Sequence, residues 1–306
     1  MQSRFDTHAV LNQPPPLEGI SWYHADAALL EGLEREGAGW ADERVTRFGE
    51  VLARPETIAL GRDANRFVPE LRTHDRFGHR IDEVVYHPAW HAVMALAMEH
   101  QVHNLPWREP RAGANVARSA MHSLLSQIEA GACCPITMTF AAVPALRHEP
   151  EVAAEWEPAV RRTDYDPDLR PIADKGAVQI GMAMTEKQGG SDVRANRTEA
   201  LPIGDGAFEL VGHKWFCSAP MSDAFLTLAQ TERGLSCFLV PRIRPDGAHN
   251  PLRIQRLKDK LGNRSNASAE IEYVGTWARL LGEDGRGLRT IMEMVHHTRL
   301  DCVSGS

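Results

Sequence analysis

Hydrophobic residues in the first 160 positions recur mainly at the spacing of an amphipathic helix. Leucines within 29–33 follow Asp26, a residue type that caps helix N-termini. His87 and Pro88 predict the start of another helix, because proline is tolerated in a first turn. Further groups with helical spacing are Val45, Phe48, Val51 and Leu52; Trp90, Val93, Met94 and Ala97; Val116, Leu124, Leu125 and Ile128; and Val152, Trp156 and Val160.

A proline interrupts this pattern near the middle of the chain. The segment Cys133–Pro135 predicts a break before the apolar stretch Ile136–Leu146, because an interior proline removes a helical hydrogen bond. With that break, the simplest interpretation of the first half is an all-α domain.

The period of the pattern changes after a segment rich in Asp, Pro and Gly at Asp164–Lys175. Apolar residues then alternate from Val178 to Met184, which predicts a strand. Further predicted strands are Phe208–Val211, Ala224–Gln230, Leu235–Val240, Leu252–Leu257 and Ala269–Val274. Helical spacing returns after the loop Gly282–Gly287. We therefore predict an α+β multidomain chain: an N-terminal helical domain at 1–177, a middle antiparallel β domain at 178–280, and the beginning of a C-terminal helical bundle at 281–306.

Composition and charge narrow the function classes. The chain has 306 residues, 43% of them hydrophobic, and a net charge of -7, which opposes a protein-wide surface for nucleic-acid phosphates. One local basic stretch, within 253–264, would meet CoA phosphates or DNA, or would simply be a solvated strand face. The first residues lack a secretory apolar segment, no apolar run approaches membrane-spanning length, and the five cysteines include no C-x-x-C pair. We expect a cytoplasmic protein with reduced thiols and no membrane partner.

The most informative stretch is Met182–Asp192, which passes from the alternating strand into a polar loop with two adjacent glycines. Glycines let a backbone approach a pyrophosphate, and successive N–H groups with the Ser191 hydroxyl make an anion-binding concavity. Thr185 is placed to hydrogen-bond a heterocycle. The alternative is a glycine turn in which Thr185 and Ser191 bond locally.

Three ordered motifs resemble those of the acyl-CoA dehydrogenase family. The first motif, T-E-x-x-x-G-S-D, is matched by Thr185, Glu186, Gly190, Ser191 and Asp192, with Lys187 where the family usually has proline. The second, the W-x-x-S/T region, is matched by Lys214–Ser218. The third comprises K-L-G-x-R and L-G-x-x-x-x-G, which are matched by Lys260–Ser265, Leu280–Gly282 and Gly285–Leu288. The segments Met184–Val193, Arg256–Ser268 and Cys134–Ala141 resemble the adaptive DNA-alkylation-response (AidB-type) branch of that family, and this resemblance extends over nearly the whole chain.

The resemblance implies a three-domain flavoprotein whose C-terminal domain is truncated here. FAD would lie between domains and subunits of a homotetramer, acyl-CoA would be a further ligand, and double-stranded DNA would bind through the missing C-terminal domain. In the family an aromatic residue packs near the flavin, for which Trp215 and Phe216 both qualify, and a hydroxyl, here that of Ser218, reaches the flavin N5 edge. The implied cofactor-binding residues are Met182, Met184, Thr185, Gly190, Ser191, Trp215, Phe216 and Ser218.

The resemblance is unfavourable for catalysis by this chain. The family's carboxylate base lies in the C-terminal bundle or, in the isovaleryl type, just before an Arg early in that bundle, and the matching pair here is Thr298–Arg299. Thr298 cannot act as a carboxylate base, so no catalytic residue is predicted. Arg299 is a candidate substrate-binding residue for a phosphate or a polarised carbonyl, or else forms a salt bridge on the helix surface.

Other signals are weaker. His87 and His91 have a metal-compatible spacing but lack the Glu of an H-E-x-x-H motif, and His296 and His297 point in different directions on a helix, so no metal site is predicted. Gly282–Gly287 precedes a helix but lacks the G-x-G-x-x-G order of a Rossmann fingerprint. The functional hypotheses are thus an FAD-binding protein of the DNA alkylation-damage response that protects DNA and oxidises or detoxifies small substrates, an ordinary dehydrogenase for short or branched acyl-CoA, or an inactive fragment.

Overall fold

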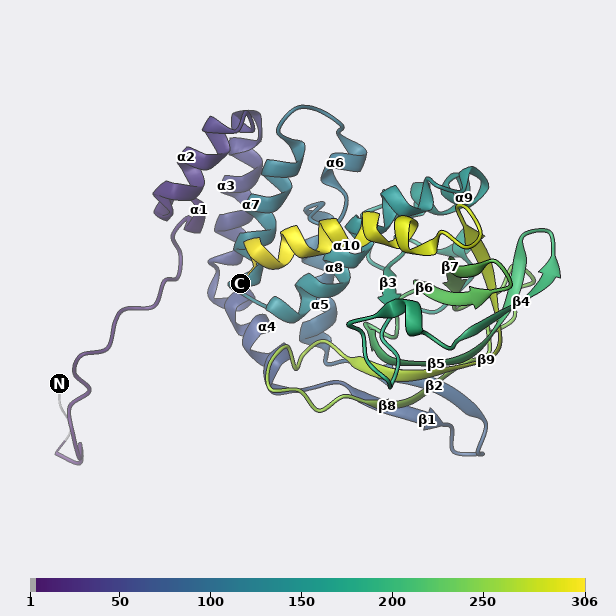
Figure 1. Ribbon diagram of the computed structural model, residues 1–306. Coiled ribbons are helices and arrows are strands. Elements are labelled where there is room, and N and C mark those ends of the chain that lie inside the picture. The colour runs from purple at the N-terminus through teal and green to yellow at the C-terminus, as the bar shows by residue number, and fades with distance from the viewer. Residues whose placement is uncertain (1–3, 306) are drawn as a thin grey trace.

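The computed structural model describes residues 4–305, in which helices dominate the first half and strands the second (Figure 1). The helices are α1 (Trp22–Ala25), α2 (Ala27–Arg35), α3 (Asp42–Leu52), α4 (Pro55–Arg66), α5 (Pro88–Glu99), α6 (Leu105–Arg108), α7 (Ala114–Ser126), α8 (Ala130–Leu146), α9 (Pro150–Val160) and α10 (Gly287–Ser304). The strands are β1 (Glu70–His74), β2 (Arg80–Val85), β3 (Ile180–Ala183), β4 (Glu199–Gly204), β5 (Ala207–Ser218), β6 (Ala224–Thr231), β7 (Gly234–Pro241), β8 (Leu252–Leu257) and β9 (Ser268–Leu281). The α+β fold class is confirmed, while the boundaries at 177/178 and 280/281 stay predictions.

The prediction of an all-α first domain is wrong, because β1 and β2 form an antiparallel hairpin between α4 and α5. The side chain of Asp75 closes its turn by accepting hydrogen bonds from the backbone N–H groups of Phe77 and His79. Arg80 Nη2 donates to the Ile254 carbonyl at 2.8 Å, which ties the hairpin to β8. Most hairpin side chains are exposed or half-buried, so the segment carries only a weak hydrophobic signal.

The predicted break at Cys133–Pro135 is also wrong, because α8 runs through both Pro135 and Pro144. Pro144 has no N–H to donate to the carbonyl of Phe140, four residues earlier. Trp107 Nε1 donates to that carbonyl instead, at 2.9 Å. Tertiary contacts of this kind, together with burial of nearly every residue of α8, let the helix continue where local propensity predicts a stop.

The second half forms a strongly bent sheet that closes on itself. Pairings join β3 to β6, β6 to β7, β7 to β9, β9 to β5, and β5 back to β3, with β4 and β8 beside this ring. The sheet is mainly antiparallel, as expected, but β3 pairs parallel to β6 over residues 180–183, and one parallel pair links β4 to β6. Closure removes most of the exposed strand edges that would invite aggregation.

Helix α10 lies between the helical half and the sheet (Figure 1) and contacts α7, α8, β6 and β7. At its start, a Cβ on Gly287 would lie 2.2 Å from the backbone carbon of Ser236, so the helix packs directly on β7. The described residues before α1 extend away from the body (Figure 1). No helix among residues 4–305 combines the length and the apolar character needed to cross a membrane; the cytoplasmic location stays a prediction.

Candidate functional site

A cavity of about 550 Å³ opens where α8, α10, β3 and β5 meet. Its volume is in the ordinary range for small-molecule sites. The residues around it are His122, Ala130, Cys133, Cys134, Thr137, Met138, Met182, Met184, Thr185, Phe216, Ser218, Asn263, Thr298, Asp301, Cys302 and Gly305. Met138 of α8 and Met182 of β3, more than forty residues apart in sequence, thus line one site.

Five of the eight predicted cofactor-binding residues line this cavity: Met182, Met184, Thr185, Phe216 and Ser218. Of the two aromatic candidates, Phe216 faces the cavity, whereas Trp215 packs beneath Lys258, whose Nζ lies 3.1 Å from the ring centroid. Gly190 and Ser191 lie in the exposed loop after Thr185 and do not line the cavity. The roles of all eight residues toward a cofactor stay predictions.

The conformation of the Thr185 loop follows from a buried carboxylate. Glu186, fully buried, accepts hydrogen bonds from the backbone N–H groups of Arg197 and Thr198, from the Thr198 hydroxyl and from Lys214 Nζ at 2.8 Å. A Cβ on Gly190 would lie 2.6 Å from Thr185 Oγ1, so a larger residue there would displace the Thr185 side chain. The T-E-x-x-x-G pattern thus has a structural reason in this chain.

The electrostatics of this pair are set by burial and by mutual attraction. Burial alone would raise the pKa of Glu186, but Lys214 and the hydrogen bonds from Arg197 and Thr198 lower it to about 2. Burial lowers the pKa of Lys214 to about 8, although Glu186 opposes that shift. Both groups are therefore charged at neutral pH and form a buried ion pair that fixes the loop at the cavity edge.

The wall formed by α10 carries a second buried ion pair. Asp301, one turn after Thr298, pairs with Arg118 of α7 and accepts a hydrogen bond from the Thr137 hydroxyl at 2.7 Å. Because the Thr137 proton goes to the carboxylate, the bond of 3.0 Å between Thr137 Oγ1 and His122 Nε2 must be donated by His122. Burial, and then the charge of Arg118, lowers the pKa of His122 to about 4, so this histidine is neutral at pH 7.

No free carboxylate base is available on this wall. Burial would raise the pKa of Asp301, but Arg118 and the hydrogen bonds from Arg118 and Thr137 lower it below its ordinary value, so the group is a weak base. Thr298 lines the cavity, and its hydroxyl donates to the carbonyl of Val295 in its own helix at 2.9 Å. Arg299 is exposed and does not line the cavity, and its substrate-binding role stays a prediction.

Sequence reasoning missed the contributions of α7 and α8, namely His122, Cys133, Cys134, Thr137 and Met138. The spacing of Thr298 and Asp301, three residues apart on one helix face, was an available signal for Asp301. The α8 residues gave no such signal, because that helix is apolar on all sides.

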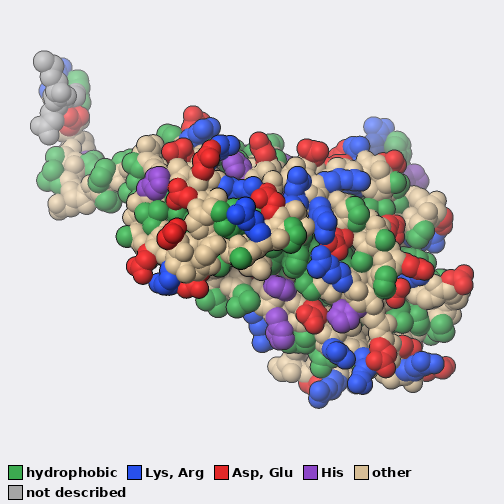
Figure 2. Space-filling view, turned by 90° about the horizontal axis from the view of Figure 1, so that it is seen from above, with side chains coloured by type: hydrophobic (Ala, Val, Ile, Leu, Met, Phe, Trp, Pro, Cys, Tyr) green, Lys and Arg blue, Asp and Glu red, His purple; other side chains and the backbone are tan. Residues whose placement is uncertain are grey.

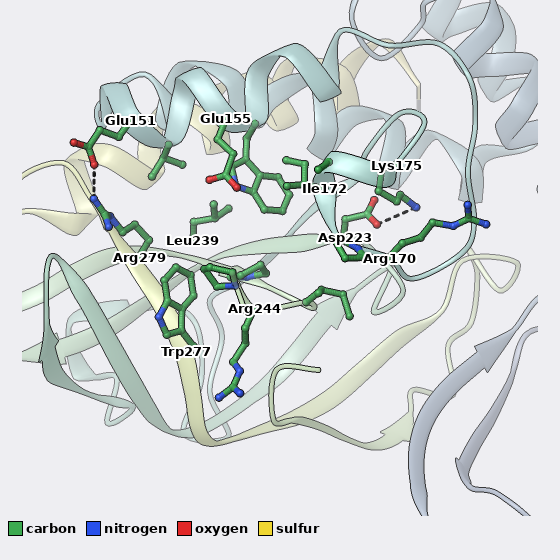
Figure 3. Close-up of a pocket in the computed structure, with 17 residues that line it drawn as sticks. Glu151, Glu155, Arg170, Ile172, Lys175, Asp223, Leu239, Arg244, Trp277 and Arg279 are labelled. Carbon is green, nitrogen blue, oxygen red and sulfur yellow. Dashed lines mark hydrogen bonds and ion pairs between the residues drawn. The ribbon is translucent and has the colours of Figure 1, made fainter. Parts of the chain in front are cut away.

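A second cavity of about 350 Å³ lies between α9, the segment before β3 and the sheet (Figure 3). Ion pairs lie at its two ends, Glu151 with Arg279 at 2.6 Å and Lys175 with Asp223 at 3.1 Å. Figure 3 shows Glu155 and Leu239 facing the space from opposite sides. None of the predicted site residues lines this cavity.

Only some of the basic side chains in the stretch within 253–264 are available to a ligand, because others are engaged in ion pairs or partly buried. Arg256 and Lys258 both pair with Glu270, at 2.6 and 2.8 Å, and Lys260 is half-buried. On the face of the molecule shown in Figure 2, Lys and Arg side chains are interspersed with Asp and Glu. His87, one of the histidines considered for a metal, instead caps α5 by accepting a hydrogen bond from Ala89.

The fold and the position of the cavity define a class. The crystal structure of Caenorhabditis elegans ACDH-11 in complex with C11-CoA superimposes with a TM-score of 0.87 at 28% sequence identity, covering 99% of this chain and 53% of that one. Butyryl-CoA dehydrogenase from Megasphaera elsdenii gives 0.59 at 15% identity over 86% of this chain and 63% of its own, a likeness of fold alone. The architecture is that of an acyl-CoA dehydrogenase.

The family within that class follows from the sequence comparisons. The profile of the adaptive response protein AidB N-terminal domain matches residues 12–167, and that of the acyl-CoA dehydrogenase middle domain matches 181–275. AidB of Escherichia coli (strain K12) is 51% identical over 304 residues, 99% of this chain and 56% of AidB. The chain belongs to the AidB family of acyl-CoA dehydrogenase-type proteins, and it spans about half the length of the relatives it matches.

Proposed function

We propose that this chain provides the flavin-side walls of an FAD-dependent acyl-CoA dehydrogenase-type protein that acts in the response to DNA alkylation. The observation that carries the proposal is the convergence of Met182, Met184, Thr185, Phe216 and Ser218 on one cavity. These residues offer apolar surface for a ring system and hydroxyl groups for its polar edge, a combination that suits an isoalloxazine. Bound FAD would supply the hydride acceptor.

Different residues of the chain would bind the flavin, hold the loop beside it and face the acyl group. Thr185 and Ser218 offer hydrogen bonds at the cavity edge, and the buried Glu186 holds the Thr185 loop in place. Helices α8 and α10 face the sheet across the cavity, where an acyl group would have to lie to meet a flavin. Binding of C11-CoA by ACDH-11 supports an acyl-CoA as the ligand of this space. A carboxylate base would have to come from outside this chain, because Thr298 occupies the position early in the bundle.

The role in DNA protection is supported by membership of the AidB family. With a net charge of -7 and mixed charges on the face in Figure 2, a DNA-binding surface is expected in the part of the relatives that this chain does not span. We also propose a homotetramer for the full-length protein.

The cofactor is tested by purifying the full-length protein and measuring its flavin absorbance after reconstitution with FAD. One FAD for each subunit is expected, and Phe216→Ala should lower the affinity while the exposed Leu201→Ala should not. Absence of a stoichiometric complex would refute the proposal. Bleaching of the flavin by acyl-CoA then separates dehydrogenase activity from a purely DNA-protecting role, for which salt-dependent binding to unmodified duplex DNA is the signature.

A further inference from the structure

Three polar groups form a continuous chain from the loop after β8 to the cavity wall. Lys260 Nζ donates to Ser268 Oγ at 3.1 Å, and Ser268 Oγ lies 3.4 Å from Ser218 Oγ. Ser218 and Ser268 are directly paired residues of β5 and β9. Ser218 lines the cavity, whereas Ser268 is only 1% exposed. The chain therefore connects a cation outside the cavity with a hydroxyl group inside it.

The charge on Lys260 sets the direction of these hydrogen bonds. An ammonium group can only donate, so Ser268 Oγ must accept from it and direct its own hydrogen elsewhere. The acceptor within reach is Ser218 Oγ. Because Ser218 Oγ then accepts from Ser268, its own hydrogen is free to point into the cavity. Without Lys260, the Ser218 hydrogen could instead be donated to Ser268 and be lost to a ligand.

The surroundings keep this arrangement in place. Lys260 Nζ also donates to the carbonyl of Asn266 at 2.6 Å, which fixes its position. The neighbouring Lys258 is neutralised by Glu270, whereas no ion pair of Lys260 with a carboxylate occurs within residues 4–305. Cys134 lies beside Ser218, and burial raises the pKa of its thiol to about 11. The thiol is therefore protonated at neutral pH and is a weak competitor for the Ser218 hydrogen.

We propose that Lys260 is a positioning residue that acts through Ser268 to hold the Ser218 hydroxyl as a hydrogen-bond donor toward the flavin, and thereby raises the reduction potential of the flavin. The proposal rests on the FAD site proposed above. Reduction adds electron density to the isoalloxazine ring, and a donor that is pre-oriented and polarised by a cation stabilises that density. The positive charge itself stays outside the cavity, so the potential is tuned without a cation in the substrate space.

The test is the reduction potential of the FAD-loaded full-length protein, measured by spectral titration against a reference dye. Lys260→Met removes the charge and the donor, and Ser268→Ala breaks the chain while keeping the charge. In both variants we expect the equilibrium to shift about tenfold toward oxidised flavin, equivalent to about 30 mV for a two-electron couple. The matched control is Arg264→Met, which removes a charge from the same exposed loop and should leave the potential unchanged within about twofold.

Each outcome decides the matter. Variants Lys260→Met and Ser268→Ala that bind FAD with the potential of the parent protein would overturn the proposal. A shift of the reduction potential in Lys260→Met but not in Ser268→Ala would show a direct effect of the charge and overturn the relay through Ser268. An equal shift in Arg264→Met would also overturn the relay. If Lys260→Met does not fold, Ser268→Ala gives the answer. A parent protein without bound FAD would refute the proposed function, whereas normal FAD binding with unshifted variants would refute the relay alone.

Discussion

The buried pair of Lys214 and Glu186 gives the sharpest test of how the cavity edge is held. Replacement of Lys214 by Met keeps most of the side-chain volume but leaves the Glu186 carboxylate fully buried without its cation. Breaking a buried pair in this way typically costs about 3–5 kcal/mol. The loss should lie near the lower end of that range, because Glu186 keeps the hydrogen bonds from Arg197 and Thr198.

The pH dependence of the loss distinguishes this cause from a simple packing defect. In the parent protein the pKa of Glu186 is lowered to about 2, so its contribution to stability is present above the unfolded-state pKa and is lost as the pH falls through about 2. In Lys214→Met, burial without the cation raises the pKa of Glu186. As the pH falls, this carboxyl group is therefore protonated in the variant before it is protonated in the parent protein, and the cost of burying its charge disappears. The difference in unfolding free energy should therefore be largest at pH 7 and shrink toward pH 4. Lys214, with a pKa of about 8, stays charged over this range.

Urea unfolding of both proteins, followed by tryptophan fluorescence at pH 7, 5.5 and 4, measures the effect. The double variant Glu186→Gln with Lys214→Met should recover part of the loss, because no unpaired charge remains buried. Lys187→Met, which removes an exposed charge next to Glu186, should change stability by less than about 0.5 kcal/mol. A loss below about 1 kcal/mol, or one that does not vary with pH, would refute this account of the pair.

Three further predictions address other parts of the site. Asp301→Asn leaves Arg118 buried without its counter-ion, so urea unfolding should show a loss of about 3 kcal/mol, and an unchanged midpoint would contradict the pairing. Trp107→Phe removes the donor that replaces the missing N–H of Pro144 and should lower the free energy of unfolding by about 1–2 kcal/mol. In a Pro144→Ala background the helical hydrogen bond is restored, so a double-mutant cycle should find a smaller loss for the same substitution. Gly190→Ala should weaken FAD binding at least about tenfold by displacing the Thr185 side chain, with near-parent far-UV circular dichroism; unchanged affinity would count against the loop geometry.

The order of helices, strands and a last helix was predictable because the hydrophobic period changes clearly near residue 178. The hairpin β1–β2 was not, because its side chains are mostly exposed and carry no strong alternation. The continuation of α8 through Pro144 depends on Trp107, more than thirty residues away, which no local pattern can reveal. Closure of the sheet involves parallel pairing of β3 and β4 with β6, which is likewise a property of the whole fold.

The residues of the site also fall into two groups: those that the sequence indicates and those that only the folded structure brings to the site. Motif resemblance pointed to Thr185, Phe216 and Ser218, which line the cavity, because the motifs are short spacings that can be read from the sequence. It gave no indication of Thr137 or His122, because these residues belong to the site only through the packing of α7 and α8 against α10. Residues that support a site through tertiary contacts leave no spacing for a motif to record.

The two buried ion pairs explain why the cavity has defined walls. Glu186 with Lys214 fixes the loop on the sheet side, and Asp301 with Arg118 fixes α10 on the helical side. Each carboxylate is further held by hydrogen bonds from its neighbours, so a small displacement would leave several buried polar groups unpaired. Such networks favour one geometry over nearby alternatives even where they add little net stability. Because all four charged groups lie within this chain, the Thr185 loop and α10 are each held in place by residues of this chain.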